Sequence, residues 1–250
     1  MGIKKKSKYQ IELMKMAGND VALVHQAMKE NIKEGVTTKE LDIIANKIIR
    51  ANKCDPTFLG YNGFPASICA SVNEQVVHGI PSDDVVLKNG DIVSIDVGAT
   101  YRGFVGDSAW TYPCGEISDE CKMLLKATED SLFQGLSRAT AGAGLEEVAG
   151  AIEDVAKWNN LGIVRQYGGH GVGKQMHEEP FIYNYRTNSK IILEAGMTLA
   201  IEPMLNLGGD DVKELDDRWT VVTKDGRPSA HFEHSVLITD GEVEILTKLL

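Results

Sequence analysis

The chain has 250 residues, a length that suits one large domain or two small ones with a sizeable core. Hydrophobic residues make up 43% and charged residues 25%, which is the composition of a globular rather than a disordered protein. The net charge of −10 argues against nucleic acid as the main ligand, so we expect no DNA partner. The sequence has no run of apolar residues long enough to cross a bilayer and no signal-peptide core, so we expect no membrane association.

The distribution of lysines predicts a solvated N-terminus, and the spacing of the cysteines is typical of a cytoplasmic protein. The one basic run is short and terminal, so we expect it to be a solvated tail rather than a binding patch: Lys4, Lys5, Lys6 and Lys8. The four cysteines contain no CxxC pair and are predicted to be reduced thiols: Cys54, Cys69, Cys114 and Cys121.

Hydrophobic periodicity predicts the same order of elements twice: two helices, then strands. The predicted helices cover residues 8–34, 38–53, about 118–139 and about 144–160. Thr37 and Thr38 are the candidates for the N-cap of the second helix. The predicted strands of the first half cover residues 67–72, 92–97 and 108–112, and a second strand-rich stretch runs from residue 161 to residue 250.

Two sequence echoes favour an internal duplication. The segment from Leu87 to Asp96 and the segment from Leu193 to Glu202 both read Leu-x-x-Gly, then an apolar strand ending in Ile and an acid. A looser echo links the His-Gly pairs at positions 78 and 170. We therefore predict one domain over residues 1–250, with halves at about 1–115 and 116–250 related by a pseudo-two-fold axis. Such an axis brings Asp96 and Glu202 together, which is costly unless a cation lies between them.

Acidic residues in apolar strand contexts point to a metal site. Asp96, Asp107, Glu202 and Glu233 each lie next to apolar strand residues. A hairpin that turns at residues 99–103 would bring Asp96 and Asp107 together. Any one of these acids alone is typical of a salt-bridged strand end. Four of them, with few basic residues nearby, favour a metal.

One histidine stands out by its neighbours. His170 is flanked by glycines, which offer no packing partner and permit the close approach of a ligand. His25 and His234 are expected to be structural, and the role of His231 stays open. The segment 168–174 nearly spells a phosphate-binding loop, but Gln175 stands where that loop needs Ser or Thr, so we expect no nucleotide site.

The joint set of motifs resembles the type I methionine aminopeptidases over essentially the whole chain. The motifs that carry the resemblance are His78-Gly79-Ile80-Pro81, Ile95-Asp96-Val97-Gly98, Gly106-Asp107, Gly169-His170-Gly171-Val172-Gly173, His177-Glu178-Glu179-Pro180, Ile201-Glu202-Pro203-Met204 and Phe232-Glu233-His234. The resemblance implies an α/β (α+β) pita-bread fold, in which helices cover a curved antiparallel sheet made by two pseudo-two-fold related halves.

The resemblance also implies two divalent metal ions and a set of catalytic residues. The implied metal ligands are Asp96, Asp107, His170, Glu202 and Glu233. Asp107 and Glu233 would bridge the ions, and Glu202 would also carry the proton. His78 and His177 would contact the substrate around the scissile amide. The site chemistry fits cobalt, manganese or iron at least as well as zinc.

A substrate pocket and a further ion site are implied as well. The implied pocket residues are Tyr61, Phe64, Cys69, His78, His177 and Trp219. From the residues alone, Tyr61 and Phe64 are equally typical of core aromatics. Met176 and Phe58 depart from the family's usual residues and would alter the pocket rim. Asn73 and Ser229 match a monovalent-cation site of some members.

The function that this resemblance implies is removal of the N-terminal methionine from nascent proteins when the second residue is small. Transient ribosome contact and a monomeric state are expected. Two alternatives stay open: a proline-specific aminopeptidase or prolidase of the same fold, and a non-catalytic pita-bread binding module. Retention of all five ligand types argues against the binding module, and chain length argues against the prolidase.

Overall fold

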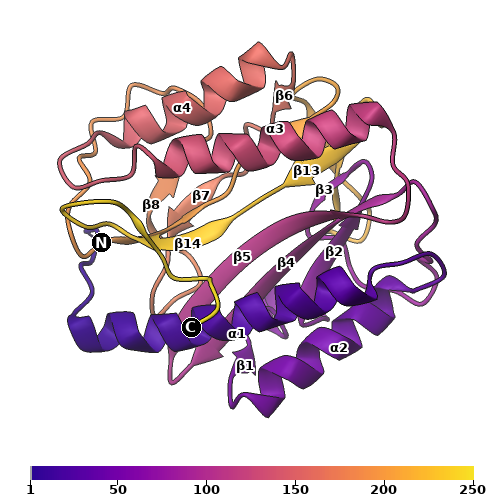
Figure 1. The fold of residues 1–250 in the computed structure, drawn as a ribbon, viewed down its shortest axis with the longest axis horizontal. Helices are drawn as coiled ribbons and strands as arrows, with labels where there is room; N and C mark the ends of the chain where they lie inside the picture. Colours follow the sequence, from indigo (N-terminus) through magenta and orange to yellow (C-terminus); the bar gives the residue numbers. More distant parts are fainter. Residues whose placement is uncertain (1) are drawn as a thin grey trace.

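A computed structural model describes residues 2–250, and in it the strands lie between two pairs of helices (Figure 1). The described helices are α1 (Lys8–Asn31), α2 (Thr38–Ala51), α3 (Asp119–Leu136) and α4 (Leu145–Trp158). Helices α1 and α2 lie over one group of strands, and α3 and α4 lie over another. No helix among residues 2–250 is long and apolar enough to cross a membrane.

The strands are short except for one long hairpin. They are β1 (Asp55–Pro56), β2 (Ile68–Val72), β3 (Gln75–Val77), β4 (Ile92–Tyr101), β5 (Phe104–Pro113), β6 (Gly162–Ile163), β7 (Gly169–Gly171), β8 (Glu178–Ile182), β9 (Thr198–Ile201), β10 (Met204–Asn206), β11 (Val212–Glu214), β12 (Val221–Thr223), β13 (Ser229–His231), β14 (His234–Leu237) and β15 (Glu244–Ile245). The strand pairs are antiparallel, and the largest sheet has the order β15-β14-β9-β7-β8. This mixed α/β architecture, with helices over antiparallel sheets, confirms the predicted fold class.

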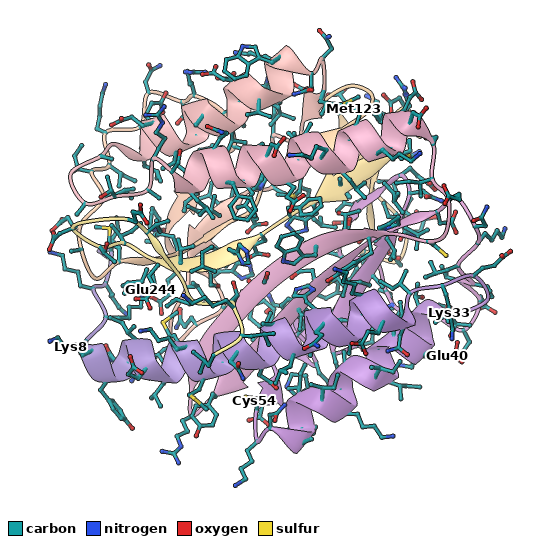
Figure 2. All side chains as sticks on the ribbon, in the orientation of Figure 1. Lys8, Lys33, Glu40, Cys54, Met123 and Glu244 are labelled. Atoms are coloured by element: carbon teal, nitrogen blue, oxygen red, sulfur yellow. The ribbon has the colours of Figure 1, made fainter. Side chains whose placement is uncertain are left out.

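Local sequence explains where the helices begin. Ser7 and Gln10 form a capping box at the start of α1, and Thr37 and Glu40 form one at the start of α2. Both helices end two or three residues before their predicted ends. Lys8, at the start of α1, is exposed at the surface (Figure 2).

The buried faces of the two helix pairs build separate parts of the core. Met28 of α1 and Leu41 of α2 pack in one cluster with residues of β4. Leu124 of α3 and Ile152 of α4 pack in another with residues of β9. Each pair therefore fixes one part of the sheet structure, while the predicted duplication of the halves stays a prediction.

The long hairpin turns later and more tightly than the sequence predicted. β4 continues to Tyr101 and β5 begins at Phe104, so the turn is Arg102-Gly103 rather than residues 99–103. Both turn residues have positive φ angles, 47° and 80°, as in the type I′ turns that match the twist of paired strands. Because a turn of this type needs only two residues, strand pairing continues to Tyr101 and Phe104, and the turn is shorter than predicted.

A buried histidine links α1 to this hairpin. The Nε2 atom of His25 lies 3.0 Å from the carbonyl oxygen of Ser108, which can only accept, so Nε2 carries the proton. Nδ1 lies 2.9 Å from the hydroxyl of Tyr112. Burial lowers the pKa of His25 from its usual 6.5 to about 3, so the ring is neutral in the fold. This agrees with the structural role expected for His25.

This neutral histidine predicts acid sensitivity. The unfolded chain takes up a proton on His25 below about pH 6.5, whereas the folded chain does so only near pH 3, so stability is lost as the pH falls between these values. On lowering the pH from about 7.5 to about 4.5, we expect His25→Gln to lose on the order of 2–3 kcal/mol less unfolding free energy than wild type. Urea unfolding at the two pH values measures this. Equal losses in the two proteins would contradict it.

Candidate functional site

The acidic residues singled out in the sequence come from different strands or strand ends and meet in one cluster. Asp96 lies on β4 and Asp107 on β5, where Asp96 pairs with Ala109, two positions from Asp107. This diagonal arrangement puts the two carboxylates on one face of the hairpin. Glu202 directly follows β9, and Glu233 lies between β13 and β14.

Hydroxyl groups lock the strands that carry these acids. Ser108 Oγ donates to the carbonyl oxygen of Glu233 at 2.6 Å, and Ser235 Oγ donates to that of Asp107 at 2.8 Å. The backbone amide of Glu233 donates to the carbonyl oxygen of Ala109 at 2.8 Å. The long hairpin and the C-terminal strands are thereby fixed against each other, so both acids have rigid backbones.

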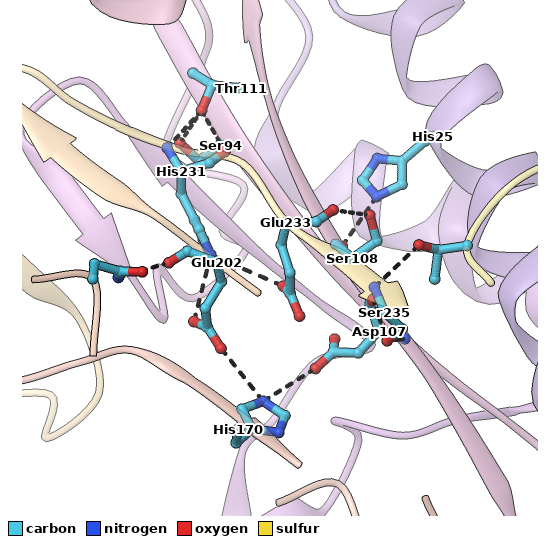
Figure 3. Close-up of polar contacts among 12 residues, drawn as sticks. His25, Ser94, Asp107, Ser108, Thr111, His170, Glu202, His231, Glu233 and Ser235 are labelled. Carbon is cyan, nitrogen blue, oxygen red and sulfur yellow. Dashed lines mark hydrogen bonds and ion pairs between the residues drawn. The ribbon is translucent and has the colours of Figure 1, made fainter. Parts of the chain in front are cut away.

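His170 directs one ring nitrogen toward Asp107 and Glu202 (Figure 3). Its Nδ1 lies 2.9 Å from the carbonyl oxygen of Gly171, so Nδ1 carries the proton and Nε2 keeps its lone pair. Nε2 lies 3.6 Å from Asp107 Oδ2 and 3.4 Å from Glu202 Oε1. Burial, and to a lesser degree His177, lowers the pKa of His170 to about 3, so the ring is neutral. The unprotonated Nε2 of His170 therefore faces carboxylate oxygens with no hydrogen between them.

A proton or a cation would stabilise the buried carboxylates of this cluster. Burial first, and then neighbouring carboxylates, raise the pKa values of Asp107 and Glu233 well above their usual range. Burial also raises that of Glu202, and it raises the pKa of Asp96 to about 7. One carboxylate oxygen in each of Asp96, Asp107 and Glu233 is buried without a hydrogen-bond partner. Such orphaned acceptors are costly unless a proton or cation binds them.

The donor set fits a divalent metal ion. One ligand atom from each of Asp107, His170 and Glu233 lies within 4.8 Å of the others, and all three residues are buried. The proton that His170 donates to Gly171 is the outer contact that typically orients a metal-binding imidazole. Carboxylate oxygens with a single imidazole suit manganese, iron or cobalt at least as well as zinc.

Sequence reasoning left one residue of this cluster undecided. His231 is buried, and its Nε2 lies 3.6 Å from Glu202 Oε2 and 3.9 Å from Glu233 Oε2 without a hydrogen-bond partner. Its backbone is held by Thr111, whose hydroxyl donates to the carbonyl oxygen of His231 at 2.9 Å. The available signal was its spacing, since residues two apart in an extended segment project to the same side.

The cluster lies at the wall of a cavity of about 700 Å³. Asp96, Asp107, His170, Glu202 and Glu233 all line it, and so do the predicted pocket residues Tyr61, Phe64, Cys69, His78, His177 and Trp219. The structure therefore brings every predicted metal, catalytic and pocket residue to one cavity, whereas Asn73 and Ser229 do not line it. Phe58 and Met176 also line it and are buried, so the two departures from the family pattern belong to the pocket wall.

Aromatic contacts shape the apolar side of this cavity. The rings of Phe64 and Trp219 lie edge to face at 5.1 Å between centroids. The His78 ring lies 6.3 Å from Trp219 and 5.7 Å from Tyr167, a lining residue that sequence reasoning missed. His78 has a φ angle of 60°, a left-handed conformation that is uncommon outside glycine and typical of functional sites.

The second cavity histidine approaches the cluster from its rim. The ring of His177 lies 4.4 Å from that of His170, and its Nδ1 lies 2.8 Å from the hydroxyl of Tyr61. Burial lowers the pKa of His177, so the neutral ring is favoured. His177 thus stands beside the buried cluster while one ring nitrogen is engaged with the cavity wall.

Comparison with known proteins shows the family of the chain. The model of metallopeptidase family M24 matches residues 12–240. The chain belongs to this family. It is 50% identical to methionine aminopeptidase 1 of Bacillus subtilis over 245 residues, which cover 98% of each chain. A solved structure of a Thermotoga maritima methionine aminopeptidase superposes with a TM-score of 0.97 at 42% identity, covering 99% of this chain and 100% of that one.

These matches confirm the predicted resemblance to methionine aminopeptidases. A prolidase from Pyrococcus furiosus shares the fold at a TM-score of 0.76 and 22% identity, and this chain covers 65% of it. The M24 peptidase described here is thus far more similar to methionine aminopeptidases than to that prolidase.

The glycines around His170 serve backbone packing rather than ligand access, which corrects the predicted reason for them. A Cβ atom on Gly169 would lie 2.3 Å from the carbonyl oxygen of Ala200, and one on Gly171 would lie 2.2 Å from that of Glu179. β7 runs between β8 and β9, and only glycine permits this close approach of strands.

The basic N-terminal run is not wholly a solvated tail, and this prediction was wrong for Lys6. The Lys6 side chain is 6% exposed and pairs with Glu178 at 2.8 Å, while its backbone amide donates to the carbonyl oxygen of Gly196. Glu178 Oε1 in turn accepts from the backbone amide of Gln175 at 3.2 Å. The pair therefore anchors the loop that carries His177. Local charge composition gives no signal of a partner so distant in sequence.

Loss of this buried pair should be costly. We expect Lys6→Met to lower the free energy of unfolding by about 3 kcal/mol, because it leaves the Glu178 carboxylate buried and unpaired. Lys5→Met is the matched control, because the Lys5–Glu194 pair is more than half exposed and should contribute no more than about 1 kcal/mol. Adding Glu178→Gln to Lys6→Met should recover part of the loss. Chemical unfolding compares the variants, and equal effects of the two lysine substitutions would refute the anchor.

Asn73 and Ser229 are neighbours in the structure. The backbone amide of Ser229 donates to the carbonyl oxygen of Asn73 at 2.9 Å. The side-chain oxygen of Asn73 accepts from the amide of Ile92, and the hydroxyl of Ser229 donates to the carbonyl oxygen of Leu205. A monovalent cation beside them stays a prediction.

Proposed function

We propose that this protein removes the N-terminal methionine from proteins and peptides whose second residue is small. The observation that carries the proposal is the buried cluster of acids around the unprotonated Nε2 of His170, at the wall of a cavity lined by aromatic residues. Its similarity to proteins named methionine aminopeptidase over nearly its full length supports the same conclusion.

The proposed metal ligands are Asp96, Asp107, His170, Glu202 and Glu233. Asp107 and Glu233 are the candidates for holding both ions, because one ligand atom of each lies within 4.8 Å of the other and of a His170 nitrogen. Bound divalent ions would supply the Lewis acidity that polarises a peptide carbonyl and activates water at neutral pH. Cobalt, manganese, iron and zinc all suit such a site.

The chain's own residues would handle the proton. We assign to Glu202 the acceptance of the proton of the attacking water and its return to the nitrogen of the departing peptide. Glu202 suits this task because its carboxylate reaches the cavity while its backbone carbonyl oxygen accepts a hydrogen bond from Asn184 at 3.0 Å. The backbone that carries this carboxylate is therefore held at the cavity wall.

Two histidines would orient the substrate. His177 lies beside His170 and has one nitrogen engaged by Tyr61, which leaves Nε2 free to donate to the scissile amide region. His78 lines the cavity against Trp219 and Tyr167. Such donors stabilise charge that develops on the carbonyl oxygen in the transition state.

The proposed side-chain pocket is formed by Tyr61, Phe64, Cys69, His78 and Trp219, next to Phe58 and Met176. Aromatic and sulfur-containing walls suit an unbranched thioether side chain. A charged first residue would be buried without a partner and should be rejected. Nascent chains are the natural substrate pool, and ribosome contact, a monomeric state and cytoplasmic location stay predictions that accompany this proposal.

A panel of peptides under one metal condition tests the function. Mass spectrometry of manganese-loaded protein should show methionine released from a Met-Gly peptide and much slower release from a Met-Leu peptide. Lys-Gly and N-acetylated Met-Gly peptides should stay intact, because the pocket and the cluster need an uncharged side chain and a free amine. Preferential cleavage of an Ala-Pro peptide would instead place the protein with the proline-specific peptidases.

A further inference from the structure

A row of aromatic side chains leads out of the cavity along β8 and the residues that follow it. This aromatic row consists of Phe181, which lines the cavity, then Tyr183 and Tyr185. Ring centroids lie 4.7 Å apart in the first pair and 5.3 Å apart in the second. Ile182 and Asn184 between them are buried, so the chain alternates as an extended strand with an aromatic outer face.

The strand register places this row on the same side of the sheet as His170 and the acids around it. Phe181 pairs with His170 across β7 and β8. Directly opposite residues of paired strands project from the same face of a sheet. The row therefore begins beside His170 and continues away from it along the edge strand of the five-stranded sheet.

The row is exposed near the cavity and fixed at its far end. Phe181 is 42% exposed and Tyr183 is 39% exposed, which is unusual for neighbouring aromatic rings. At the far end, the guanidinium carbon of Arg165 lies 4.6 Å from the ring centroid of Tyr185. The Tyr185 hydroxyl donates to the carbonyl oxygen of Arg165 at 3.4 Å, and Arg165 pairs with Asp210 at 2.6 Å. These contacts fix the position of the Tyr185 ring, against which the Tyr183 ring packs.

We propose that the aromatic row is a binding track for the part of the substrate chain that follows the scissile bond, from about the third residue onward. The inference rests on the proposed function, because a peptide with its first residue at the cluster must leave through the cavity mouth, where Phe181 lies. The occupant is therefore the substrate's own downstream chain. An extended chain presents alternate side chains to one side, so the track favours apolar or aromatic third and fifth residues.

Charge at the mouth would add little selectivity. The residues lining the cavity include Lys4 and Glu179, which carry opposite charges, while Glu178 is already paired with Lys6. The exposed aromatic surface is therefore the feature with which downstream residues can interact selectively. Aromatic contacts of this kind are each expected to change affinity by roughly two- to tenfold.

Two peptides measure the track directly: Met-Gly-Leu-Ser-Leu-Ser and Met-Gly-Ser-Ser-Ser-Ser. We expect wild type to cleave the leucine peptide with a kcat/KM about three- to tenfold higher, mainly through a lower KM, because downstream contacts are the same before and during reaction. Tyr183→Ser should bring this ratio close to one. Tyr9→Ser is the matched control, because Tyr9 lies on α1 and is 67% exposed, and it should keep the wild-type ratio.

A binding measurement separates this inference from the proposed function. Fluorescence anisotropy of the dye-labelled peptides Gly-Leu-Ser-Leu-Ser and Gly-Ser-Ser-Ser-Ser needs no turnover and should show the same preference and the same loss in Tyr183→Ser. If wild type fails to cleave either methionine peptide, the proposed function fails. If wild type shows no preference between leucine and serine peptides, or if Tyr183→Ser keeps the preference, the aromatic row is not a substrate track.

Discussion

Replacing Glu233 with glutamine should abolish metal binding and activity without unfolding the protein. Glu233 is buried, and the neighbouring carboxylates Asp107, Glu202 and Asp96 add to burial in raising its pKa. We expect metal affinity to fall by at least about 100-fold, since even outer partners of metal ligands contribute 10- to 100-fold. The metal-free variant should unfold at the same temperature as metal-free wild type or higher, because a buried charge has been removed. Elemental analysis and calorimetry measure these two effects.

His177→Ala is the control that separates ligands from substrate contacts. His177 lies at the cavity rim with Nδ1 against Tyr61, so its loss should leave metal content unchanged. Turnover should fall by about 10²- to 10³-fold, as when one donor to a developing oxyanion is removed. If His177→Ala loses metal as completely as Glu233→Gln, the division between ligands and substrate contacts is wrong.

Removing metal should abolish peptidase activity and lower thermal stability. The buried acceptor atoms around His170 lack hydrogen-bond donors. An ion that binds them therefore stabilises the folded state relative to the unfolded one. At a free ion concentration about 100 times Kd this is worth about 2.7 kcal/mol, or roughly 5–10 °C in Tm for a chain of this size. Manganese, iron or cobalt should restore both properties. Restored stability without restored activity would contradict a catalytic role for the ions.

The helices were predictable because their signals are local. Apolar spacing located α1 and α2, and Thr37, one of the two predicted N-cap candidates, caps α2; the capping box that Ser7 forms at the start of α1 was not predicted. The short strands after residue 161 were predicted only as a strand-rich stretch, because strands such as β7 and β13 have three residues each and depend on distant partners. The tight turn at Arg102-Gly103 also let strand pairing continue to Tyr101, so the turn occupies only the last two residues of the predicted turn.

The candidate site was predictable from residue types in unusual contexts. Acids inside apolar strands carry their own signal, and Asp96, Asp107 and Glu233 indeed lie at one cavity. His231 has no such signal beyond its spacing to Glu233, and only the packed structure places it near Glu202. Lys6 was misjudged for the same reason, since its partner Glu178 lies 172 residues away.

Titration of metal into exhaustively chelated protein tests the central claim most directly. Methionine release from a Met-Gly peptide should be absent in the metal-free protein and return in step with bound manganese, iron or cobalt measured by elemental analysis. Activity should saturate as the two proposed ions fill the site, and Glu233→Gln should show neither binding nor recovery. Full activity in wild-type protein with no residual metal would contradict the account.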